Sequence, residues 1–89
     1  MREREWTDRL SDRLHELVSA EAPAGLGTWA PAWEIVEAPS GELLDELSRI
    51  EDGGGSRDRA KRLAVRLREA WREAGQQYRQ DGRGGRARQ

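Results

Sequence analysis

The 89-residue sequence contains no cysteine and no phenylalanine, and it has one histidine and one lysine. Without cysteine the chain forms neither a disulfide nor a thiolate metal site, and it has no cysteine nucleophile. A single histidine, His15, cannot complete a metal site or a catalytic triad among serines that lack a nucleophile-like context. We therefore expect a non-enzymatic protein that uses no cofactor, no metal and no small-molecule substrate.

Long hydrophobic runs are absent as well. No segment approaches 18 uncharged residues, and the N-terminal residues are charged with no apolar run after them, so we expect neither a membrane span nor a signal peptide. The expected location is cytoplasmic. All the basic residues except Lys61 are arginine, which is typical of a GC-rich genome and favours a bacterial or phage origin.

The net charge of −1 conceals two opposed blocks. Residues 21–55 carry a net charge of −7, and residues 56–89 carry +7. Two segments of opposite charge can attract each other when they pack, so the small net charge does not mean that charge is evenly distributed along the chain.

Apolar side chains recur at intervals of three and four residues in three segments, which is the spacing of one face of an α-helix. We predict a first helix over about residues 3–20, a second over about 41–52 and a third over about 57–79. Ser40 and Ser56 are the predicted N-caps, and the three glycines at 53–55 are predicted to end the second helix in a turn. The apolar positions are Trp6, Leu10, Leu14, Leu17 and Val18, then Leu43, Leu44, Leu47 and Ile50, then Ala60, Leu63, Ala64, Leu67, Ala70, Trp71, Ala74 and Tyr78.

The fold prediction is therefore all-α, a small three-helix bundle over residues 1–80 with a flexible Arg/Gly-rich tail over 81–89. All three prolines fall between the first two predicted helices, together with Gly25 and Gly27. Because proline lacks the amide donor and disfavours helical geometry before it, we expect a long irregular connection over residues 21–39.

The predicted helices differ in length. At about 1.5 Å per residue the third would span about 35 Å and the second about 18 Å. We expect the second and third helices to pack side by side as an antiparallel hairpin. The end of the third helix that bears Trp71 and Tyr78 would then extend beyond the second helix. Its apolar side chains would have to pack against the first helix, the connection or another chain. Because apolar residues are also few, a monomer would be marginal, and we expect burial against a second copy or another protein.

The leading functional hypothesis is a small protein–protein interaction module, an adaptor or regulator, that acts through the third helix and the Trp-containing connection. Aromatic side chains on a loop either anchor a partner or fold back as a lid on the core, and the sequence leaves both open. The predicted partner-binding residues are Trp29, Trp33, Trp71 and Tyr78.

The alternative hypothesis is a nucleic-acid-binding regulator. Arginine and lysine share one flank of the third helix and continue into the tail, where they could bind phosphates, unless the acids of the second helix, or Glu69 and Glu73, already pair with them. The residues concerned are Arg57, Lys61, Arg68, Arg72, Arg79, Arg83, Arg86 and Arg88.

Overall fold

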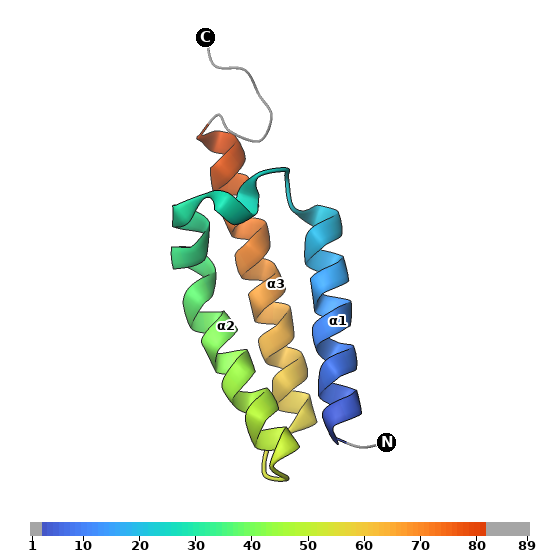
Figure 1. The fold of residues 1–89 in the computed structure, drawn as a ribbon. Helices are drawn as coiled ribbons and strands as arrows, with labels where there is room; N and C mark the ends of the chain where they lie inside the picture. The colour runs from blue at the N-terminus through green and yellow to red at the C-terminus, as the bar shows by residue number, and fades with distance from the viewer. Residues whose placement is uncertain (1–2, 82–89) are drawn as a thin grey trace.

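The computed structural model describes residues 3–81, and all regular structure in this range is helical. Helix α1 covers Glu3–Glu21, a short 3₁₀ helix η1 covers Leu26–Thr28, α2 covers Ala30–Glu51 and α3 covers Arg57–Gln80. Figure 1 shows the three long helices alternating in direction, with α2 antiparallel to α1 and α3. Within residues 3–81, no helix is both long enough and apolar enough to cross a membrane.

The predicted fold class and two of the three helices are confirmed. The first and third helices match their predicted ranges to within one residue at each end. The hydroxyl of Ser56 accepts a hydrogen bond from the Arg59 amide at 3.2 Å, so Ser56 is the N-cap of α3 as predicted. Of the predicted tail over 81–89, Asp81 is the C-cap of α3, and the remaining residues lie outside the described range.

The predicted start of the second helix is wrong. Helix α2 begins at Ala30 rather than near residue 41, so the irregular connection is confined to residues 22–29 and Ser40 lies inside the helix. Pro31 lies in the first turn, where an amide has no intrahelical acceptor and its loss costs nothing.

Pro39 lies inside α2, where it leaves the carbonyl of Ile35 without the usual amide donor. The helix nevertheless continues through this position, because residues before and after the proline share one buried face. Packing along this face outweighs the lost hydrogen bond. The buried apolar residues of α2 are Ala32, Val36, Leu43, Leu47 and Ile50.

The longer α2 removes the expected overhang. With 22 and 24 residues, α2 and α3 span about 33 and 36 Å, so they pack along nearly their whole length. The end of α3 that bears Tyr78 is covered by η1 and the start of α2 (Figure 1), so of the three kinds of cover that the sequence leaves open, the connection and its neighbouring helix provide it.

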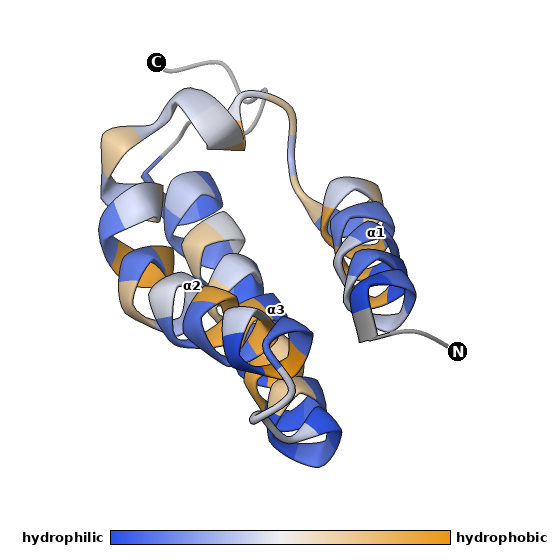
Figure 2. Cartoon of the chain, turned by 60° about the horizontal axis from the view of Figure 1, so that its bottom comes forward, coloured by the Kyte–Doolittle hydropathy of each residue, from blue (hydrophilic) through white to orange (hydrophobic). Residues whose placement is uncertain are grey.

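The hydrophobic core lies between α2 and α3 and has two parts. Figure 2 shows the hydrophobic positions of these helices gathered between them. The larger cluster is formed by Val36, Leu43, Leu47 and Ile50 of α2 with Ala60, Leu63, Ala64 and Leu67 of α3. The second cluster, at the other end of the hairpin, is formed by Leu26, Ala32, Ala74 and Tyr78.

The α2–α3 turn is closed by backbone hydrogen bonds and one buried acid. The amides of Gly53 and Gly54 donate to the carbonyls of Ile50 and Arg49 at 3.0 and 2.8 Å, which is a Schellman motif with Gly53 at φ 92°. The three glycines therefore end the helix as predicted.

Glu46 is the buried acid at this turn, with 3% of its surface exposed. Its Oε2 accepts from the amide of Ser56 at 2.7 Å, and its Oε1 accepts from Arg49 Nη1 at 3.1 Å and Arg59 Nε at 3.2 Å. The hydrogen bond from Ser56, followed by that from Arg49, lowers the pKa of Glu46, although burial opposes this. The carboxylate thereby joins α2 to the first residues of α3.

The connection between α1 and α2 packs against the end of α3. Gly25 has φ 87°, and an added Cβ there would collide with the hydroxyl of Tyr78. That hydroxyl donates to the carbonyl of Ala24 at 3.0 Å, and the Tyr78 ring meets Trp29 edge to face with ring centres 5.3 Å apart. Trp29 and Tyr78 together fix the connection over the second cluster.

Substituting Gly55→Ala should lower the free energy of unfolding by about 2 kcal/mol, through a clash in a packed turn. A Cβ at Gly55 would lie 2.7 Å from the backbone nitrogen of Ile50 and 2.9 Å from Glu46 Oε2. Gly54→Ala is the matched control, because its nearest atom, the Arg49 carbonyl oxygen, is 3.9 Å away. Urea unfolding followed by circular dichroism measures both variants, and equal stability would contradict the described turn.

Candidate functional site: an uncharged groove between α1 and α2

Helix α1 packs against the α2–α3 hairpin through a face that is only partly buried. Of residues 4–21, Thr7 alone is buried, and the apolar positions of the helix keep partial contact with solvent. In Figures 1 and 2, α1 lies apart from the close pair formed by α2 and α3. The partly buried apolar residues of α1 are Trp6, Leu10, Leu14, Leu17 and Val18.

Polar contacts hold the first turns of α1. The hydroxyl of Thr7 lies 2.8 Å from Glu51 Oε2 and 2.9 Å from the carbonyl oxygen of Arg4, and its single proton can go to either acceptor. The guanidinium of Arg57 lies 5.1 Å from the ring centre of Trp6, within cation–π range. Both contacts join α1 to the α2–α3 turn.

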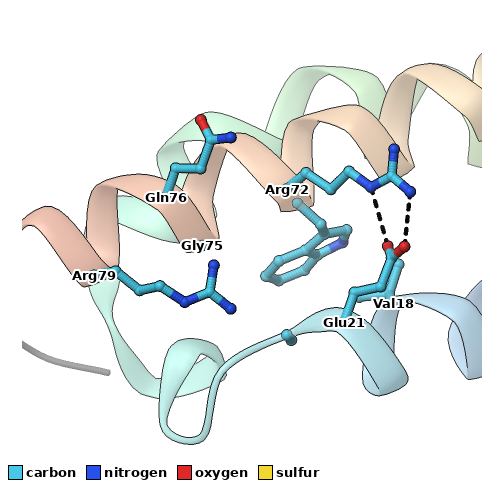
Figure 3. Close-up of a pocket in the computed structure, with 8 residues that line it drawn as sticks. Val18, Glu21, Arg72, Gly75, Gln76 and Arg79 are labelled. Atoms are coloured by element: carbon cyan, nitrogen blue, oxygen red, sulfur yellow. Dashed lines mark hydrogen bonds and ion pairs between the residues drawn. The ribbon is translucent and has the colours of Figure 1, made fainter. Parts of the chain in front are cut away.

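Glu21 holds the other end of α1. Its two carboxylate oxygens accept four hydrogen bonds, from Nε and Nη2 of both Arg68 and Arg72, at 2.7–3.3 Å. The hydrogen bonds from Arg68 and then from Arg72 lower the pKa of Glu21 to about 2. Figure 3 shows Glu21 turned toward α3 at the edge of a recess of about 220 Å³ that Gln76 and Arg79 also line.

Between these two ends, α1 and α2 leave an open groove of about 460 Å³, here called the α1–α2 groove. Its floor includes Leu43, Leu47 and Leu67, and α1 contributes Leu14 and Val18 to its wall. Seventeen residues line it, and none of them is Asp, Glu, Arg or Lys. In a sequence that is 37% charged, this surface is set apart by its lack of charge.

Trp33 lies at the end of the groove nearest η1, and 52% of its surface is exposed. Its indole N–H donates to the carbonyl of Gly27 at 2.8 Å, and its ring meets Trp71 edge to face with centres 5.2 Å apart. The ring is therefore fixed in orientation while part of its surface faces solvent, which suits a contact surface that loses little entropy on binding.

The four predicted partner-binding residues lie in two places. Trp29 and Tyr78 pack in or against the second core cluster. Trp71 is partly buried and lines the α1–α2 groove with Trp33. Trp29 of the connection and Trp33 of the first turns of α2 therefore both pack against the hairpin. Of these two, only Trp33 remains half exposed.

The predicted phosphate-binding residues are dispersed among internal contacts. Arg68 and Arg72 bind Glu21, and Arg57 lies over Trp6. The acids of α2 bind other arginines, with Glu46 on Arg59 and Glu42 on Arg66 at 3.3 Å. Lys61 borders the α1–α3 side and Arg79 lines the recess by Glu21, while Arg83, Arg86 and Arg88 lie outside the described residues.

His15 is exposed and lines the α1–α2 groove. Within residues 3–81, no three His, Asp or Glu side chains are placed to hold a metal ion together. In the α1–α2 groove, His15 is the one ionisable side chain among the lining residues.

The prediction that Leu43 and Leu44 belong to one apolar face of the second helix is wrong for Leu44. Leu43 is buried at 4% exposure, whereas Leu44 is 61% exposed and lines the groove. Adjacent residues of a helix point about 100° apart, so two consecutive leucines already indicate a second apolar surface on α2.

Comparisons with models of protein families, with curated proteins and with solved structures gave no match for this chain.

Acid should weaken the wild-type protein more steeply than the variant Glu21→Gln. The unfolded chain takes up a proton at Glu21 near its ordinary pKa of 4.5, and the folded chain does so only near 2. The stabilisation is therefore present above about pH 5 and is lost as the pH falls toward 2. Glu16→Gln, on the same helix and without an ion pair among residues 3–81, is the control. Urea midpoints between pH 7 and pH 2.5 measure the effect, and parallel curves for the wild type and Glu21→Gln would contradict it.

Proposed function

We propose that this protein is a small non-enzymatic protein-binding module, an adaptor or regulator, whose binding surface is the α1–α2 groove. The observation that carries the proposal is the continuous uncharged lining of that groove in an otherwise highly charged molecule. Apolar grooves between helices are surfaces on which amphipathic helices dock.

The shape of the groove favours a protein partner. It follows α1 and α2 from the Gly27 and Trp33 end to Ser11 and Leu47. Along α2, Trp33 and Leu47 are 14 residues apart, which corresponds to about 21 Å or nearly four helical turns. An amphipathic helix laid between two helices contacts its host over such a length.

The chemistry of the lining also supports binding over catalysis. Apart from the single His15, the groove is lined by aliphatic residues, tryptophan, proline, glycine and serine, which provide apolar contacts and hydroxyl hydrogen bonds. General acid–base catalysis requires positioned titratable groups that act together. The apolar face of a partner helix can pack against these lining residues.

The proposal shifts the expected binding surface. The surface expected from the sequence is the third helix with the Trp-containing connection, through Trp29, Trp33, Trp71 and Tyr78. Of these residues, Trp33 and Trp71 line the groove, whereas Trp29 and Tyr78 pack in or against the second core cluster. One of the two reasons for expecting a second copy or another protein, the overhang of α3, is removed because α2 begins at Ala30. Nucleic-acid binding through the basic flank of α3 would have to compete with Glu21 for Arg68 and Arg72.

Leu44→Glu should abolish or strongly weaken peptide binding in the groove while leaving the fold intact. The probe is an 18-residue helical peptide with a leucine stripe and glutamine flanks, titrated into the full chain by calorimetry. Because Leu44 is 61% exposed, the substitution should change stability by no more than about 0.5 kcal/mol. We expect the dissociation constant to rise at least about tenfold, which corresponds to about 1.4 kcal/mol.

Val65→Glu is the matched control for this experiment. Val65 is 57% exposed and lies between α1 and α3, on the opposite side of α1 from the groove. Its variant should bind the peptide within about twofold of the wild type. Equal binding by the Leu44 variant and the wild type, or no binding by either, would refute the α1–α2 groove as the binding surface.

A further inference from the structure

We propose that the occupant of the α1–α2 groove is an amphipathic helix of another protein that carries arginine or lysine along its polar flanks. The inference rests on the proposed function and adds the chemical class of the partner. It is carried by the charges that border the groove on each side, just outside its uncharged lining.

On α1, the border next to the groove is acidic. Asp8 and Asp12 precede His15 by seven and three residues, so the three side chains share one flank of the helix. Both acids are exposed, and neither has an ion pair within residues 3–81. Arg4 shares this flank, but it lies near the α2–α3 turn, beyond the lining residues.

On α2, the facing border is acidic too. Glu37 and Glu51 lie seven residues before and after Leu44, on the same flank. Glu37 is exposed and has no ion pair within residues 3–81, and Glu51 accepts the Thr7 hydroxyl. The basic residue of α2, Arg49, points instead to Glu46.

The opposite side of α1 has the reverse charge. The smaller depression between α1 and α3, of about 160 Å³, is lined by Arg13, Lys61 and Arg68 around apolar residues. Charge is therefore segregated across α1, with acids toward the groove and bases away from it. A helix with an apolar stripe and basic flanks would place its stripe on the apolar floor of the groove and its flanks beside the acidic borders. A helix with acidic flanks would be repelled by those borders.

A second copy of this chain does not supply such an occupant. Two copies joined groove to groove would place acidic borders against acidic borders. Helix α3 is basic, but Val65 is the one exposed large hydrophobic residue that it carries. Without apolar side chains at helical spacing on its outer face, α3 cannot fill the groove. The partner is therefore a different protein.

Three peptides test the inference. They share one leucine stripe of 18 residues and differ in their flanks, which are arginine, glutamine or glutamate. We expect the arginine peptide to bind at least about tenfold more tightly than the glutamate peptide in 50 mM salt, and the ratio to shrink in 500 mM salt because screening weakens surface charges. The tryptophan indole and Leu44 methyl resonances should shift on binding.

Reversal of the border charges provides the matched control. The double variant Asp12→Lys and Glu37→Lys should favour the glutamate peptide. The double variant Glu69→Lys and Glu73→Lys changes net charge by the same amount at exposed positions of α3 that do not line the groove, and it should keep the wild-type order of affinities. Circular dichroism melts confirm that both variants are folded.

The outcomes separate the inference from the proposed function. If all three peptides bind equally, the groove binds helices but the inference about charge is overturned. If the control variant reverses the preference as strongly as the border variant, net charge is responsible and the inference fails. If none of the peptides binds, or if Leu44→Glu binds all three as the wild type does, both proposals fail.

Discussion

The arrangement of the helices depends on the buried carboxylate of Glu46. An acid with so little exposure is stable only where donors replace the water that it has lost, and here the Ser56 amide, Arg49 and Arg59 do so. Ser56 is also the N-cap of α3, so one residue both starts α3 and satisfies an acid of α2. This contact fixes the position of α3 along α2, and therefore which residues meet in both core clusters.

The two opposed charge blocks of the sequence pair with each other at three acids. Glu46 and Glu42 of α2 bind arginines of α3, and Glu21, the acid of the block that lies at the end of α1, binds both Arg68 and Arg72. Much of the acidity of α2 is consequently left on its outer side. The net charge is close to zero, but the surface of the molecule has a basic side around α3 and an acidic side that borders the α1–α2 groove.

Much of the fold could be predicted from the sequence, because strong periodicity in the first and third helices agrees with a serine cap and a glycine stop. The second helix begins earlier than predicted, because packing around Val36 and Leu43 overrides the helix-breaking effect of Pro39. The groove could not be predicted from the sequence, for a different reason. It exists only because α1 packs loosely against α2, and that spacing depends on contacts such as Glu21 with Arg68, which join residues 47 positions apart.

Helix α1 is attached by polar contacts at its two ends and by apolar side chains that are only partly buried, and this bears on its motion. The α2–α3 hairpin contains nearly all the buried apolar side chains, whereas the middle of α1 contacts solvent along the groove. Elements with few buried contacts open at a lower free energy than the whole domain. Helix α1 should therefore behave as a separate cooperative unit, whose amides exchange with solvent through partial unfolding while those of α2 and α3 exchange only when the entire domain unfolds.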